Sequence, residues 1–166
     1  MSHQPVIDGF EFARAGAKLE GEWPVAEFER LRDALRTREG ILKVRLQGIP
    51  EDQGKPALRL RISGTLQLVC QRCLGSLAFA LDVEALLHLA ATQDEVDAEP
   101  LDAEGPESIV AGREMPVRSL VEDEVLLAIP IAPRHPACAG GAREPAQAPR
   151  PSPFAGLKGM LGGTKH

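Results

Sequence analysis

The chain has 166 residues, a net charge of -5 and 43% hydrophobic residues, which suits one domain with its own core and is too short for two full ones. No apolar run approaches the roughly 20 residues that a membrane-spanning helix needs, and residues 1–5 lack the features of a signal peptide. We therefore expect a cytoplasmic protein whose three cysteines are free thiols or metal ligands rather than parts of disulfides.

Charge is distributed unevenly along the chain. Residues 94–107 contain seven acidic residues and no basic one, whereas residues 133–166 contain five basic residues and a single acidic one. The last segment therefore carries about +4 and the rest of the chain about -9. The acidic segment holds two prolines and few apolar residues, so we expect it to be a mobile, solvated loop.

Apolar residues at helical spacing predict two helices. The first covers residues 24–39, with Pro24 in its first turn and Gly40 as its stop. The second is expected to begin at Ser119, because residues 119–122 have the spacing of a capping box, and to end before Pro130.

Alternating apolar and polar residues predict strands. Residues 41–46 read as a short strand, and a loop rich in turn residues follows as far as Gly54. The even-numbered residues from 58 to 70 and the odd-numbered residues from 77 to 89 are mostly apolar, which predicts a long hairpin with Cys70 on its apolar face. Gly64 interrupts the first of these patterns and is expected to mark a bulge or a close backbone approach.

These elements predict a single-domain α+β fold, with an antiparallel sheet built on a long hairpin, two packing helices, an acidic mobile loop and an extended C-terminal tail. The α+β domain is expected to cover residues 1–132, and the acidic loop lies within it. Residues 133–166 form a Pro- and Gly-rich basic tail, in which Phe154 and Leu157 are the residues best suited to dock on the domain.

The pair Cys70 and Cys73 is the arrangement most suggestive of chemistry. A Cys-x-x-Cys turn lets two thiolates point at one ion, but a structural zinc site needs four ligands. His135 and Cys138 have suitable chemistry and would complete a Cys3His set, although 64 residues separate Cys138 from Cys73. Folding would have to bring the two pairs together.

Two other interpretations of the cysteines stay open. Buried free cysteines commonly act as small hydrophobic residues, and a Cys-x-x-Cys pair can also be a redox pair. The redox interpretation is the weakest, because the pair follows a strand rather than opening a helix.

Catalytic signatures are absent from the sequence, so we predict no catalytic residue and no enzyme. His3 and His166 lie at the ends of the chain, and His88 falls on the polar side of a strand without an evident orienting partner. Glu122 and Asp123 are adjacent, do not face each other on a helix and are explained by helix capping.

Basic residues make a case for contact with RNA or with a protein partner. They lie on the predicted strand (Arg59, Arg61), between the cysteines (Arg72) and along the tail (Arg134, Arg143, Arg150, Lys158). The chain has five Phe, one Trp and no Tyr, and these are not interleaved with the basic residues. Contacts to an RNA backbone or to a partner are therefore more plausible than base stacking.

Three motifs in order resemble the YceD family of large ribosomal RNA subunit accumulation proteins. They are Leu68-Val69-Cys70-Gln71-Arg72-Cys73-Leu74, the segment from Val121 to Pro130, and Pro153-Phe154-Ala155-Gly156-Leu157. The resemblance covers the chain from about Leu58 onward. It implies a cytoplasmic protein that is needed for normal levels of large-subunit ribosomal RNA and for which no reaction is established. Some relatives have more cysteines after the second helix, whereas here only His135 and Cys138 stand there.

The resemblance and the basic tail together predict a non-enzymatic ribosome-biogenesis factor that supports synthesis, processing or stability of large-subunit ribosomal RNA. Its partner would be precursor large-subunit RNA or a ribosome-assembly protein, and zinc is its one candidate cofactor. The alternative is a thiol- or metal-dependent enzyme, or a redox protein, centred on Cys70 and Cys73.

Overall fold

The structure is a computed structural model and describes residues 5–100 and 105–138. Its elements in chain order are β1 (Val6–Ile7), α1 (Gly9–Arg14), β2 (Lys18–Pro24), the 3-10 helices η1 (Val25–Glu27) and η2 (Glu29–Ala34), β3 (Leu35–Thr37), β4 (Ile41–Asp52), β5 (Lys55–Val69), β6 (Ser76–Ala90), α2 (Gln93–Asp97), β7 (Glu107–Val110), β8 (Met115–Pro116) and α3 (Val117–Ala128). Strands predominate, and none of the described helices is long and apolar enough to cross a bilayer.

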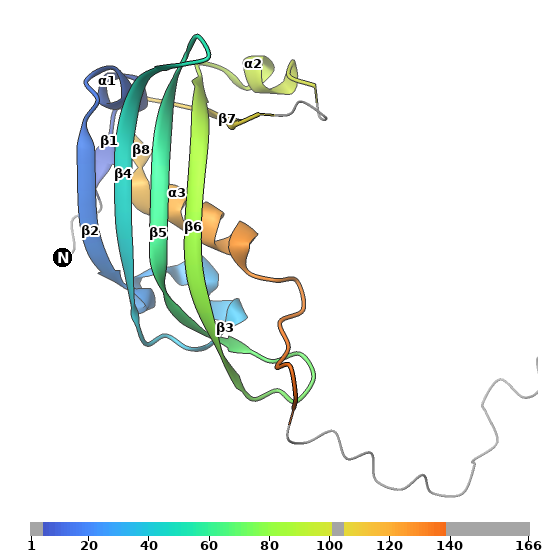
Figure 1. Ribbon diagram of the computed structural model, residues 1–166. Helices are drawn as coiled ribbons and strands as arrows, with labels where there is room; N and C mark the ends of the chain where they lie inside the picture. The colour runs from blue at the N-terminus through green and yellow to red at the C-terminus, as the bar shows by residue number, and fades with distance from the viewer. Residues whose placement is uncertain (1–4, 101–104, 139–166) are drawn as a thin grey trace, which may run out of the picture.

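One twisted sheet organises the molecule. Its strand order is β2-β4-β5-β6-β7, β3 pairs with β5 as well, and β1 and β8 form a separate two-stranded sheet. All pairs in the large sheet are antiparallel except β6 with β7. The sheet stands in front of α3 in Figure 1, and α3 crosses behind β5 and β6. The predicted α+β fold in a single domain is confirmed.

The long hairpin of β5 and β6 is the centre of the sheet, as predicted. Its register runs without a break from Ala57 opposite His88 to Val69 opposite Ser76. Gly64 causes no bulge but permits a close approach, because a Cβ there would lie 2.8 Å from the carbonyl oxygen of Ile41. Of the two roles expected for Gly64, the close backbone approach is observed and the bulge is not.

The core lies between the sheet and the helices behind it. The inward residues of β4 and β5 are almost fully buried, and α3 contributes Val117, Leu120, Val121 and Val125. Each Å² of apolar surface that this layer removes from water stabilises the fold by about 25 cal/mol. Cys70 is the last inward residue of the β5 pattern and is fully buried, which agrees with the predicted apolar face.

The loop predicted after residue 46 is mostly strand. β4 continues to Asp52, and the chain reverses at Gln53 and Gly54, which have φ angles of 52° and 82°. Positive φ at both positions matches a two-residue turn whose twist suits a hairpin, so pairing can continue up to it. Gly48 acts as a contact point rather than a turn residue, since it lies beneath α1.

Residues 24–39 do not form the predicted α-helix. They form η1, η2 and β3, with Phe28 in extended backbone between the two 3-10 helices. The buried residues Val25, Phe28 and Leu31 are spaced by three, which is the period of a 3-10 helix. Over so few residues this spacing resembles that of an α-helix, so the pattern predicts the wrong kind of helix. Leu35 is buried as part of β3, opposite Leu68.

The acidic segment is not loop throughout, which corrects that prediction. Its start forms α2, where the Thr92 hydroxyl accepts the backbone N–H of Glu95, and the Glu95 carboxylate accepts the N–H of Ala91. Acidic residues are favourable in the first turn of a helix, so the charge that suggested a loop stabilises a helix start here. Glu107 begins β7, and residues 101–104 lie outside the described part of the chain.

The second predicted helix exists as α3, but it begins at Val117 and not at Ser119. Glu122 does not cap its own helix. It is buried, and its carboxylate accepts the backbone N–H of Arg30 at the start of η2, at 3.1 Å. Arg118 of the same helix bonds Glu27, so α3 is tied to η1 and η2 by polar contacts as well as by its apolar face.

His88 also differs from expectation, because it has an orienting partner. Its side chain is buried, and its Nε2 lies 2.8 Å from Asp52 Oδ2 at the far end of β4. This contact joins the end of β6 to the end of β4. Besides η1, η2, β3 and α2, the elements that sequence patterns did not reveal are α1, β1, β2, β7 and β8.

Candidate metal centre

The turn between β5 and β6, residues 70–75, forms a compact knuckle at one end of the sheet. The Cys70 N–H donates to Gly75 O, and the Leu74 N–H donates to Cys70 O, both at 2.9 Å. Leu74 has a φ of 59°, a left-handed conformation that costs a non-glycine residue roughly 1 kcal/mol. Its side chain is 65% exposed. The turn is thus wound tightly enough to bring Cys73 back toward Cys70.

The segment after α3 returns to this knuckle. Ile129 ends the helix, and the chain then runs to Pro133, whose carbonyl accepts the N–H of Gln71 at 2.8 Å. His135 Nε2 lies 2.9 Å from the carbonyl oxygen of Ser76. Two hydrogen bonds to the backbone, one at Gln71 between the cysteines and one at Ser76 after them, therefore hold residues 133–138 against the knuckle.

Four potential metal ligands converge there. The Sγ atoms of Cys70, Cys73 and Cys138 and a ring nitrogen of His135 all lie within 4.8 Å of one another. Cys70 Sγ is 3.7 Å from Cys138 Sγ, and His135 Nδ1 is 3.4 Å from Cys73 Sγ and 3.8 Å from Cys138 Sγ. Ligands on a tetrahedral ion, with metal–sulfur bonds of about 2.3 Å and metal–nitrogen bonds of about 2.0 Å, would be roughly 3.5–3.8 Å apart. The group can therefore hold a metal ion with little rearrangement.

The contact between His135 and Ser76 selects the ligand atom of the histidine. A carbonyl oxygen only accepts hydrogen bonds, so Nε2 carries the proton and donates it to Ser76 O. Nδ1 is then the unprotonated nitrogen, and it faces the sulfurs. A second hydrogen bond that fixes the tautomer and the ring orientation is the usual surrounding of a metal-binding histidine.

The thiols have different acidities. Burial raises the pKa of the Cys70 thiol, but backbone N–H groups of Cys73, His135 and Arg72 donate toward its sulfur and, together with the Cys73 side chain, lower the pKa to about 5. Burial raises the pKa of Cys138, and the neighbouring Cys70 and Cys73 raise it further. Cys70 is therefore a thiolate at neutral pH, and an ion that enters must displace a proton from Cys138.

This acidity predicts a pH dependence of the metal-free protein. Because the pKa of Cys70 is lower when folded than its ordinary value of 9.0, its ionisation stabilises the fold fully above pH 9, and that contribution is lost as pH falls toward about 5. Ultraviolet absorbance of the thiolate in metal-free protein should show a step near pH 5 that is missing in Cys70→Ser. A single step near pH 9 would contradict the assignment.

The structure brings all four predicted ligands together. The basic residues predicted to contact RNA or a partner, in contrast, lie in different parts of the molecule. Arg72 and Arg134 are exposed at the knuckle, beside the ligands. Arg59 and Arg61 are on the outer face of β5, and both reach toward Glu84, with Arg61 at 2.8 Å. Arg143, Arg150 and Lys158 lie outside the described residues.

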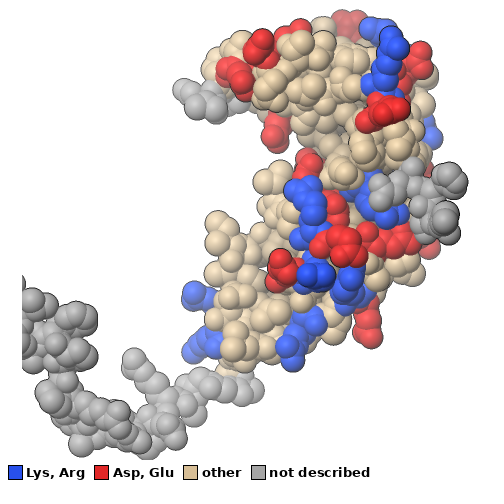
Figure 2. Space-filling model, turned by 180° about the vertical axis from the view of Figure 1, so that it is seen from behind, with Lys and Arg blue, Asp and Glu red and all other residues tan. Residues whose placement is uncertain are grey.

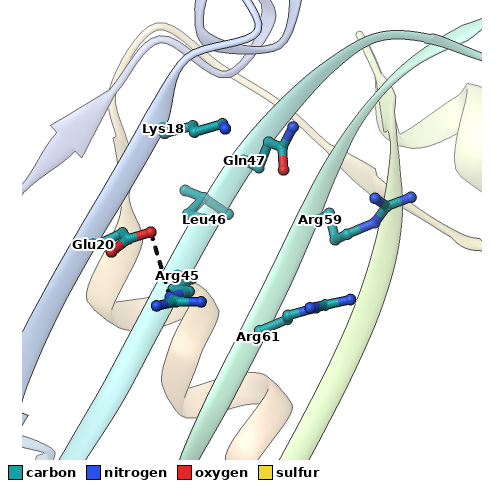
Figure 3. A pocket seen from close by; sticks show the side chains of 7 residues that line it. All are labelled: Lys18, Glu20, Arg45, Leu46, Gln47, Arg59 and Arg61. Atoms are coloured by element: carbon teal, nitrogen blue, oxygen red, sulfur yellow. Dashed lines mark ion pairs between the residues drawn. The ribbon is translucent and has the colours of Figure 1, made fainter.

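Figure 3 shows the outer sheet face around Arg59 and Arg61. A shallow hollow of about 220 Å³ is lined there by Lys18, Glu20, Arg45, Leu46, Gln47, Arg59 and Arg61. Glu20 pairs with Arg45, and the guanidinium groups of Arg59 and Arg61 point away from the hollow toward β6. Acidic partners therefore offset much of the positive charge of this face.

The knuckle end has a more uniform charge. In Figure 2, Lys and Arg side chains and no acidic ones surround the place where the described chain ends. Segments 67–78 and 131–138 contain Arg72 and Arg134 and no acidic residue, and β3 places the exposed Arg36 beside the end of β5. Arg36 is not among the predicted contacts, because its sequence pattern predicts a helix there. The three residues Arg36, Arg72 and Arg134 are called the basic end below.

Comparison with known proteins supplies one match. The family model described as large ribosomal RNA subunit accumulation protein YceD matches residues 58–161, which include most of β5, all of β6 and α3, and all four potential ligands. No curated protein and no solved structure matched the chain. Since the match spans more than half of the chain and includes the knuckle, the protein belongs to the YceD family.

Proposed function

We propose that this protein is a non-enzymatic factor of ribosome biogenesis in the cytoplasm, which binds the backbone of precursor large-subunit ribosomal RNA with its basic end. The observation that carries the proposal is the basic end itself: three exposed arginines gathered around an ordered knuckle. The family description, which names accumulation of large-subunit ribosomal RNA, supplies the class of RNA.

The physical argument rests on charge and exposure. Arginine side chains bind phosphate through forked hydrogen bonds, and release of counterions from RNA makes such contacts favourable without any reading of sequence. Arg72 and Arg134 flank ligand residues on two segments, so an ion held by the ligands would fix their separation. The tail that follows Cys138 adds four more basic residues and one acidic residue.

Zinc is the ion that we assign to the four ligands. Three thiolates and one imidazole are a common ligand set for structural zinc, and a closed set of four leaves no open position for a reacting water. The ion would stabilise the knuckle and offset two of the three thiolate charges, while the chain's own arginines make the contacts to RNA.

A thiol-dependent enzyme or redox protein is the competing function. The low pKa of Cys70 favours it, because the thiolate is the nucleophilic form. The burial of Cys70 opposes it, since no substrate reaches a side chain with no exposed surface. Replacement of Arg72 and Arg134 distinguishes the two functions. It should weaken RNA binding, whereas a thiol-dependent activity should persist because the cysteines stay in place.

The decisive experiment is crosslinking of the tagged protein to RNA in cells, with Arg72→Glu/Arg134→Glu compared with the parent. We expect precursor large-subunit RNA to be recovered with the parent and at least about tenfold less with the variant. In purified form, the variant should also show a shallower dependence of affinity on salt, by about one unit of slope for each lost phosphate contact.

Arg14→Glu/Arg113→Glu is the matched control, because both arginines are exposed, lie at the opposite end of the sheet and give the same change in charge. It should recover RNA as the parent does. Equal recovery with both double variants would contradict the assigned surface. A deletion strain with normal large-subunit RNA would contradict the function itself.

A further inference from the structure

The outer edge of β6 has no partner strand over most of its length. β7 pairs only with residues 87–90, and within residues 5–100 and 105–138 no strand pairs with residues 76–86 on the side away from β5. An exposed edge of eleven residues presents a row of backbone N–H and C=O groups to any extended segment. Such an edge is a ready template for strand addition.

The side chains beside this edge are apolar and incompletely covered. Leu77, Phe79, Val83 and Ala85 point inward from β6 and pack against the core, yet each is only partly buried. In Figure 2 the molecule is hollowed between its upper part and its middle, with mostly uncharged residues around the hollow. An added segment with apolar side chains would cover this strip as well as the backbone of β6.

The charge around the strip is negative. Asp82 lies on the outer face of β6, and Glu107 and Glu124 are close enough to affect each other. Burial raises the pKa of Glu124, and the charges of Glu107 and Asp123 raise it further. A cation placed here would relieve that repulsion, so an occupant with basic and apolar residues fits best.

The chain's own tail has that composition, and it starts at the right place. Residues 139–166 contain four basic residues and one acidic residue, and their large apolar side chains are gathered in residues 154–161. The described chain ends at Cys138, whose neighbour His135 contacts Ser76, the first residue of β6. The fifteen residues 139–153 can span up to about 50 Å, more than the roughly 35 Å of the open edge.

We infer that residues 154–161 of the tail dock along the open edge of β6, with Phe154 and Leu157 against the apolar strip and Lys158 toward Glu107 and Glu124. The family match ends at residue 161, so it includes this segment together with the edge it would cover. The inference concerns the closure of the sheet and does not depend on RNA binding.

Hydrogen exchange of the full-length protein tests it. The parent is compared with Phe154→Asp/Leu157→Asp, and with Ala146→Asp/Ala148→Asp as a control that adds the same charge to the tail elsewhere. Amides on the open side of residues 77–86 should exchange at least about tenfold more slowly in the parent and the control than in the docking variant. A synthetic peptide of residues 150–161 added to the docking variant should restore the protection.

Two results would overturn the inference. In the first, residues 77–86 exchange at the same rate in the parent and in the docking variant. In the second, their protection rises with protein concentration while sedimentation shows a dimer, which assigns the edge to a second copy of the chain.

Discussion

Removal of zinc from the purified protein is expected to lower its Tm by roughly 10 °C, equivalent to a loss of about 3–5 kcal/mol. The ion would join two segments that the protein otherwise links by hydrogen bonds such as those of Gln71 with Pro133 and of His135 with Ser76. Metal analysis should find about one zinc per chain. Calorimetry before and after chelation, followed by addition of zinc, measures the effect and its reversal.

Variants extend this prediction. Cys70→Ser/Cys73→Ser should abolish zinc binding and reproduce the Tm of the chelated protein. Ser76→Ala is the matched control, because the Ser76 hydroxyl bonds Gln67 and only its backbone carbonyl contacts His135. The core of the sheet lies elsewhere, so the far-ultraviolet circular dichroism should change little. Unchanged Tm in the cysteine variant, with no zinc in the parent, would show that the thiols are inert.

Gly48→Ala should destabilise the protein by at least about 3 kcal/mol, which makes it one of the most damaging glycine-to-alanine changes among the described residues. A Cβ at this position would lie 2.1 Å from Phe12 O and 2.8 Å from Ala13 Cα. Both are backbone atoms of α1, so no side-chain rotation can relieve the clash. Either α1 leaves the sheet or β4 bends.

Gly112→Ala is the control for Gly48→Ala, since a Cβ at Gly112 meets nothing within 4 Å. Denaturant unfolding should give the control nearly the parental midpoint and shift the Gly48 variant to much lower denaturant. Similar midpoints for the Gly48 variant and the parent would show that α1 is not held against β4 as described.

The hairpin could be predicted because its evidence is local. Along both strands between Leu58 and Leu89, the alternation of apolar and polar residues indicates which side chains face the core. Shifting the pairing of the strands by one residue would expose the whole apolar set. The same rule should have revealed β2, where Leu19 and Trp23 alternate with charged residues. Gly21 stands at the middle inward position and hides the pattern.

Other features depend on contacts that no local pattern contains. Residues 24–39 have apolar spacings that suit two kinds of helix, and the packing of Phe28 decides between them. Glu122 was assigned to capping of its own helix, whereas it caps η2, 92 residues away in the chain. His135 and Cys138 could be chosen as ligands by residue type, but their approach to Cys70 required the return of the chain after α3.

Leu74 combines two local penalties in one residue of the knuckle. Its left-handed backbone would suit glycine better, and its large apolar side chain stays in water instead of in the core. The hydrogen bond from its N–H to Cys70 O closes the turn, but within the described residues the side chain stays largely exposed. The tip of the knuckle is therefore the place where this protein gives up some folding stability, and a surface that covers Leu74 on binding would recover the hydrophobic part of that loss.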